Sequence, residues 1–78
     1  MKGYIIMDRT WHHLVRWCDA TEDQPAALWL AYAIEDDFPS EGPTLFTTKK
    51  AARKAIAITR KLPYAWANND YEIYKVSK

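Results

Sequence analysis

The chain is poor in glycine and cysteine, and each shortage excludes a class of protein. Two glycines among 78 residues exclude collagen-like sequence and any glycine-rich phosphate-binding loop. A single cysteine, Cys18, cannot build a disulfide framework and is typical of a reducing compartment. The longest apolar run, residues 26–34, is too short for a membrane span, which needs about twenty residues. Asp8 and Arg9 follow the apolar N-terminal residues so closely that we expect no secretory signal.

What the chain has instead is a high density of large apolar side chains. Hydrophobic residues make up 49% of the sequence and aromatic residues 14%, with four tryptophans. A domain of this length buries only about 60% of its unfolded surface, so large side chains must fill its core. A deep catalytic pocket would remove much of that core. We therefore expect one domain, residues 1–78, that binds a partner and is not an enzyme.

The apolar pattern predicts strands near both ends of the chain and one in its middle. Residues 3–7 and 71–76 are rich in the β-branched and aromatic side chains that strands favour. Residues 27–35 alternate bulky and small side chains, with Trp29 as the exception. This alternation favours a strand with one buried face, and an alanine-rich helix is the alternative. Residues 10–18 fit either a helix or a strand.

One long amphipathic helix is predicted over about residues 48–61. It follows a loop at residues 38–43, rich in proline, and a short extended piece at residues 44–46. Thr47 or Thr48 can cap its N-terminus, and a proline ends it. Its apolar stripe consists of Ala51, Ala52, Ala55, Ile56, Ile58, Thr59 and Leu62. The predicted fold is α+β, a three- to four-stranded, mainly antiparallel sheet with this helix on one face.

The formal net charge of +1 hides a strong segregation of charge. Residues 49–61 contain six bases and no acid, namely Lys49, Lys50, Arg53, Lys54, Arg60 and Lys61. Residues 19–41 contain seven acids and no base, namely Asp19, Glu22, Asp23, Glu35, Asp36, Asp37 and Glu41. A surface helix usually alternates signs to gain pairing between neighbouring turns. The basic face therefore predicts a binding site for phosphates or an acidic surface, and mutual attraction of two oppositely charged faces is the alternative.

Two aromatic residues lie beside the basic end of the helix. Tyr64 and Trp66 belong to a predicted loop, residues 63–70. Large aromatic side chains on a loop anchor a partner or stack on bases. The alternative is that both fold back over the end of the helix as part of the core.

Candidate metal and catalytic groups are sparse. His12 and His13 are adjacent, so their side chains diverge on a helix or a strand, and no second pair of ligands has metal-site spacing. Cys18 lacks an orienting group and a glycine-built oxyanion hole. Asp36 and Asp37 are typical of solvated residues at a strand end. We expect no catalytic residue, metal or cofactor.

The sequence resembles a group of small β-β-α-β proteins encoded in bacteriophage accessory genes. In these proteins a Phe-Thr-Thr/Ser-Lys-Lys/Arg-x-Ala motif starts the helix, as at residues 46–52 here, and a Tyr-x-Ile-x-x-Val strand closes the chain, as at residues 71–76. The resemblance covers about half of the chain, and residues 11–23 depart from the simplest members.

The resemblance implies an anti-CRISPR protein or another inhibitor of a host enzyme, acting in the bacterial cytoplasm. We therefore expect the basic residues of 49–61, with Tyr64 and Trp66, to bind a bacterial protein or ribonucleoprotein complex. In a second version of this hypothesis, Asp19, Glu22, Asp23, Glu35, Asp36 and Asp37 occupy a basic nucleic-acid channel instead. A small nucleic-acid-binding regulator that uses the helix directly is the alternative function, and a homodimer fits either function.

Overall fold

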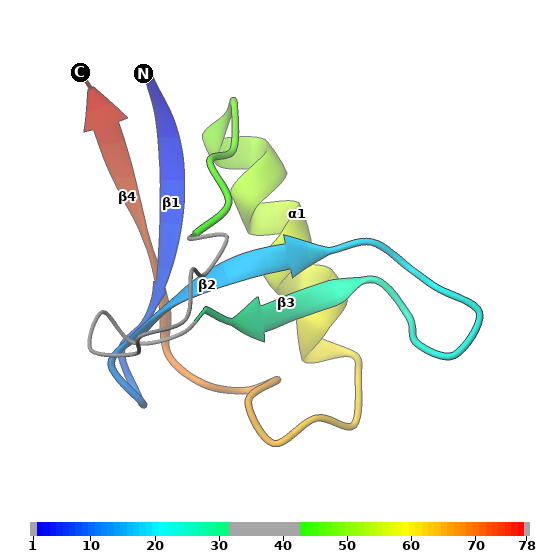
Figure 1. Cartoon of the computed structure of the whole chain (residues 1–78). Helices are drawn as coiled ribbons and strands as arrows, with labels where there is room; N and C mark the ends of the chain where they lie inside the picture. Colours follow the sequence, from blue (N-terminus) through cyan, green and yellow to red (C-terminus); the bar gives the residue numbers. More distant parts are fainter. Residues whose placement is uncertain (1, 32–42, 78) are drawn as a thin grey trace, which may run out of the picture.

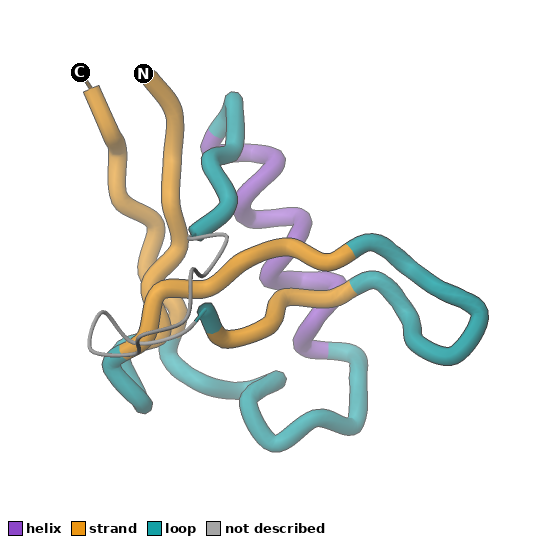
Figure 2. Tube along the Cα trace, viewed as in Figure 1, coloured by secondary structure: helices purple, strands orange, loops and turns teal. Residues whose placement is uncertain are grey.

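The computed structural model describes residues 2–31 and 43–77, and these form an antiparallel sheet with a helix on one face (Figures 1 and 2). The elements are β1 (Lys2–Asp8), β2 (His13–Cys18), β3 (Ala27–Leu30), α1 (Lys49–Arg60) and β4 (Tyr71–Ser77). The strand order is β3-β2-β1-β4, and each neighbouring pair is antiparallel. The predicted α+β class is confirmed.

The helix is shorter than predicted. It begins after Thr48, whose side chain accepts a hydrogen bond from the backbone N–H of Ala51, and it contains 12 residues. Lys61 ends it, because its N–H turns back to the carbonyls of the last turn and a proline follows two residues later. The prediction of a long helix is therefore wrong, since about three turns is an average length. Nowhere in the described part of the chain is there a helix long and apolar enough to cross a membrane.

The structure decides the two uncertain segments. Residues 10–18 hold a tight turn followed by β2, and His12 closes the turn with a positive φ of 57°. The predicted strand at residues 27–35 is confirmed over Ala27–Leu30. Residues 32–35 and the predicted loop at residues 38–42 lie outside the described residues.

The sheet opens between β1 and β2, and a later segment fills the opening. β1 pairs with β4 at seven positions but with β2 only at Met7 and Asp8. Nearer the N-terminus of β1, the backbones of Tyr4 and Phe46 exchange two hydrogen bonds of 2.8 Å. A Cβ on Gly3 would lie 2.6 Å from the carbonyl oxygen of Phe46, so only glycine permits this approach. The predicted extended piece at residues 44–46 is thus part of the sheet's framework.

The core lies between the sheet and the helix. Ile6, Val15 and Leu28 come from three strands and pack against Ala52 and Ala55 of α1. The small side chains of the helix bring it close to the sheet. Buried Ala52, Ala55 and Thr59 form the centre of its inner face, so the buried stripe is narrower than the predicted one.

A buried carboxylate joins two loops at one end of the sheet. Asp8 is fully buried, and its Oδ1 accepts hydrogen bonds from the backbone N–H groups of Thr10 (2.8 Å) and Trp11 (3.1 Å). Its Oδ2 accepts from the side-chain amide of Asn69 at 2.7 Å. The turn after β1 and the loop before β4 are therefore held together by one side chain.

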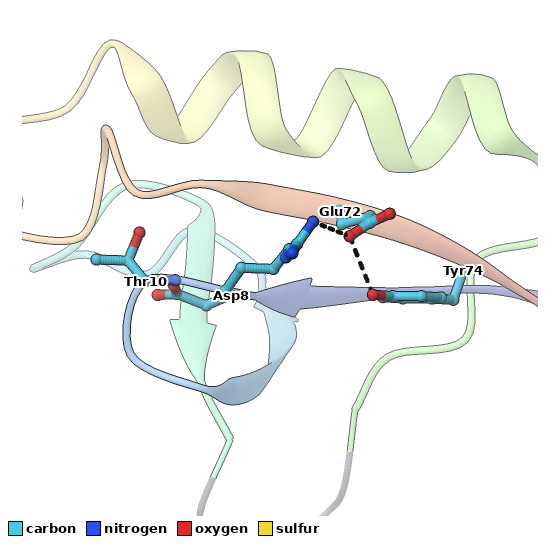
Figure 3. A network of polar contacts seen from close by, with 5 residues as sticks. Asp8, Thr10, Glu72 and Tyr74 are labelled. Atoms are coloured by element: carbon cyan, nitrogen blue, oxygen red, sulfur yellow. Dashed lines mark hydrogen bonds and ion pairs between the residues drawn. The ribbon is translucent and has the colours of Figure 1, made fainter.

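The outer face of the same corner carries an exposed polar network (Figure 3). The Tyr74 hydroxyl donates to Glu72 at 3.0 Å, and this hydrogen bond raises the pKa of Tyr74. Arg9 forms an ion pair with Glu72 at 2.9 Å. About half of each charged side chain is exposed to solvent, so the pair adds little to stability.

Candidate binding face on helix α1

The six predicted basic residues form one exposed face of α1 and its C-terminal cap. All six, Lys49, Lys50, Arg53, Lys54, Arg60 and Lys61, are exposed. At about 100° per residue they cover an arc of about 140° around the helix axis. Ala57 lies near the centre of this arc, and it is the only uncharged exposed residue of α1. We call these six bases with Ala57 the basic face.

The bases of this face form two rows along the helix. The first row is Lys49, Arg53 and Arg60, and the second row is Lys50, Lys54 and Lys61. Both rows have spacings of four and seven residues, and they are offset by one residue. Each row spans about 16 Å along the axis, and the rows are separated by about 100° around it. Spacings of four and seven residues are close to one and two turns of an α-helix, so the bases of each row line up along the axis. The local sequence alone therefore creates the two rows.

The charge of the basic face is not neutralised by any described acid. α1 carries no acidic residue, and among residues 2–31 and 43–77 the ion pair found joins Arg9 and Glu72 on the far side of β1 and β4. Lys49 and Lys50 also lie at the positive end of the helix dipole, which destabilises the helix by a few tenths of a kcal/mol each. Unpaired positive charge at the N-terminus of a helix lowers the stability of the isolated protein. Such a surface is typical of a site that binds an anion.

Arg60 has a second role inside the protein. Its guanidinium lies 5.6 Å from the ring centroid of Tyr71, and its Nη1 lies 3.4 Å from the carbonyl oxygen of Asn69. Burial raises the pKa of Tyr71 to about 12, the nearby Asp8 adds to this rise, and Arg60 opposes it. Arg60 therefore connects the basic face to the buried corner around Asp8.

The two predicted aromatic residues belong to a cluster of three. The rings of Tyr64 and Trp66 are stacked, with centroids 4.6 Å apart and planes at 16°. Trp29 of β3 lies 4.9 Å from Trp66 and 5.4 Å from Tyr64. All three are half-buried, and the indole N–H of Trp66 donates to the Leu28 carbonyl at 2.7 Å. The alternative that these residues fold back as structural groups thus has direct support, at least for Trp66.

Sequence reasoning missed Trp29 as a member of this cluster. The available signal was its break in the alternation of bulky and small residues along residues 27–35. Because successive strand side chains point to opposite faces, Trp29 lies on the other face from the buried Leu28. Only the return of the chain from α1 brings two further rings onto that indole.

The described part of the acidic surface is separate from the basic face. Asp19, Glu22 and Asp23 are exposed on the loop between β2 and β3, which extends sideways beyond the sheet (Figure 1). Asp19 accepts a hydrogen bond from the indole N–H of Trp17 at 3.1 Å. The remaining predicted acids, Glu35, Asp36, Asp37 and Glu41, lie outside the described residues.

The candidate metal and catalytic groups are spread along β2. His12 lies in the turn before it, whereas Cys18 is its last residue, so about 16–20 Å of extended chain separates them. Among the residues that the structure places, no three His, Cys, Asp or Glu side chains come together as metal ligands. The Nδ1 of His13 is buried, and none of the described residues gives it a hydrogen-bond partner.

No protein-family model, curated protein or solved structure matches this chain. The resemblance to the phage accessory proteins therefore remains an expectation from the two motifs that carry it.

Proposed function

We propose that this chain is a non-enzymatic binding module that docks the basic face of α1 onto an anionic surface of a bacterial nucleic-acid-processing complex and blocks it. The observation that carries the proposal is the exposure of six bases on α1 and its C-terminal cap without a described acid beside them. Such a surface attracts an anionic partner over several ångströms and holds it through charged contacts. The protein acts in the cytoplasm of the bacterial cell that contains this complex.

The rigidity of the basic face supports this proposal. Ala52 and Ala55 fix the helix against the sheet, and Thr59 holds it to β3 through a 2.9 Å hydrogen bond from the Leu28 N–H. Charged groups on a rigid element lose less conformational freedom on binding than groups on a loop. The face is thus preorganised for one partner orientation.

The inhibitor part of the proposal is supported by the resemblance to phage accessory proteins. In the motif shared with them, Thr48 caps the helix, and Lys49 and Lys50 follow it directly onto the exposed side. The same short motif therefore starts the helix and begins both rows of charge. This dual use fits a protein whose function is to present a charged helix.

The proposal is tested by capture from a bacterial lysate with a tagged protein, with and without nuclease. The double variant Arg53→Glu with Lys54→Glu is expected to lose the captured complex and its inhibition while keeping the circular-dichroism spectrum. The matched control is Lys2→Glu with Lys75→Glu, which makes the same change in net charge at two exposed positions on β1 and β4. Equal capture by both double variants and the parent protein would show that the basic face is not the site.

If the acidic residues bind the partner in place of the basic face, the same assay gives the opposite result. Substitution of Asp19, Glu22 and Asp23 by the corresponding amides removes the described negative charge of the β2–β3 loop. Loss of capture in this variant alone would assign the binding site to that loop. We expect this variant to bind as the parent protein does.

A further inference from the structure

We propose that the anion taken by the basic face is the phosphate backbone of double-stranded DNA, with α1 lying in the major groove. This inference rests on the proposed function for its choice of face and adds the chemical identity of what that face contacts. It comes from three features of α1: two rows of charge, a small residue between them, and exposure of the whole face along the helix.

The two rows match the two walls of a groove. An α-helix with its side chains is about 10–12 Å across, and the major groove of B-form DNA is about 12 Å wide. A helix in that groove has one phosphate strand on each side. The first row would reach one strand and the second row the other, through Lys49 and Arg53 on one side and Lys50 and Lys54 on the other.

Ala57 lies between the rows, where the helix would face the floor of the groove. Its methyl group allows the helix backbone to approach the base edges closely. It offers no hydrogen-bond donor or acceptor, and an apolar contact with a thymine methyl group is the only base contact available to it. Charged contacts to phosphate surround this position on both sides. The inferred binding is therefore largely independent of DNA sequence.

Other anionic partners use the observed features less completely. The major groove of A-form RNA is too deep and narrow for a helix of this kind. A single strand follows one line of charge and stacks its bases on free aromatic rings, whereas the rings of Tyr64, Trp66 and Trp29 pack against one another. An acidic protein surface requires neither two matching rows nor a small residue between them.

The first test measures binding of the purified full chain to a short fluorescent B-form DNA duplex as a function of salt. Among the described residues, no hydrogen bond, ion pair or ring contact engages the side chains of five bases of the basic face, whereas Arg60 lies over the ring of Tyr71. Each phosphate that a base neutralises contributes about −0.9 to the slope of log affinity against log salt concentration. If these five bases each neutralise one phosphate, the expected slope is about −4 to −5. A slope shallower than about −1 would overturn the inference.

The second test separates the two rows. Lys49→Gln with Arg53→Gln, and Lys50→Gln with Lys54→Gln, should each make the slope shallower by about 2. Equal effects are expected because both walls of the groove are contacted. An effect of only one pair would overturn the groove geometry. Lys2→Gln with Lys75→Gln on the sheet is the matched control and should leave the slope unchanged.

The third test uses size in place of charge. Ala57→Leu keeps the charge of the face and a good helix former, but it holds the helix away from the groove floor. We expect an unchanged salt slope and affinity weaker by about tenfold, comparable to one mismatched base pair. Ala57→Ser, which is small, should lose less affinity than Ala57→Leu. Equal binding by both variants would contradict the placement of Ala57 on the groove floor.

The lysate capture assay distinguishes the two proposals. A protein complex that is captured through the basic face and survives nuclease, together with no binding to the purified duplex, overturns this inference and leaves the proposed function standing. Loss of both duplex binding and capture overturns both. Duplex binding with the expected slope, together with capture that depends on nuclease-sensitive material, supports the inference.

Discussion

The indole N–H of Trp66 donates to the backbone carbonyl of Leu28 at 2.7 Å, and this contact closes one edge of the sheet. The N–H of Leu28 donates in turn to the hydroxyl of Thr59 at 2.9 Å, and that hydroxyl donates to the carbonyl of Ala55. Leu28 lies on β3, an outermost strand, so these groups would otherwise be open to pairing with another chain. A loop and a helix together occupy them.

Trp66→Phe is expected to destabilise the fold by about 1–3 kcal/mol, because the Leu28 carbonyl loses its donor while staying enclosed. Denaturation in urea, followed by circular dichroism, measures this loss. Trp29→Phe is the matched control, since it makes the same ring contraction in the same cluster without removing a described hydrogen bond. If both variants lost the same stability, ring packing and not the edge contact would be the cause.

Asp8→Ala is expected to cost more than about 3 kcal/mol, because it leaves the N–H groups of Thr10 and Trp11 and the amide of Asn69 without their acceptor. That is a large share of the stability of a chain of this length, which is on the order of 4–12 kcal/mol. Asp70→Ala, at an exposed neighbouring position, should unfold at nearly the parent's urea concentration. A small effect at Asp8 would mean that the two loops are held by other contacts.

Ala57→Glu separates binding from stability. A glutamate at this position lies four residues from Arg53 and Lys61 and three from Lys54 and Arg60, so it gains favourable pairs worth about 0.2–0.5 kcal/mol each. Glutamate has a lower helix propensity than the alanine it replaces, and this difference cancels a few tenths of a kcal/mol of the gain. We expect equal or slightly higher stability together with loss of the anionic partner. Ala57→Gln introduces a side chain of nearly the same size as Ala57→Glu without the charge, so a greater loss of binding in Ala57→Glu than in Ala57→Gln assigns the difference to electrostatics.

The raised pKa of Tyr71 predicts that the protein loses stability at alkaline pH. Its pKa is raised from 10.0 in the unfolded chain to about 12 in the fold, so the folded state favours the protonated hydroxyl. The resulting stabilisation is complete below about pH 10 and is lost as the pH rises toward about 12. The difference in urea midpoint between the parent protein and Tyr71→Phe should therefore shrink over this range. A difference that stays constant with pH would contradict the raised pKa.

Much of the fold could be predicted because its elements are signalled locally. The β-branched residues of β1, the capping threonine before α1 and the period of the helix each act over a few residues. The exposure of all six bases followed from the same period. The predicted helix was too long because the turn of Lys61 back onto the last turn depends on geometry that the pattern does not reveal.

The aromatic cluster and the buried carboxylate were not predictable in this way. Trp29 and Trp66 are far apart in the sequence and meet only when the chain returns from α1 to the edge of β3. In the sequence Asp8 is simply a charged residue that ends an apolar run, whereas the structure buries it completely with donors from two loops. Contacts between distant segments depend on how the elements pack, which single-sequence periodicity does not encode.

The sequence by itself determined β1, β4 and α1, the charge segregation and the two rows on α1, because backbone preferences and helix periodicity are local properties. The tertiary structure decided which residues become structural. It enclosed Asp8, joined Trp66 to Leu28, and held Arg60 against Tyr71. Within the part of the chain that the structure describes, no hydrogen bond, ion pair or ring contact engages the side chains of the other five bases of the face. The physical reason is that a buried polar group must find a hydrogen-bond partner wherever packing provides one.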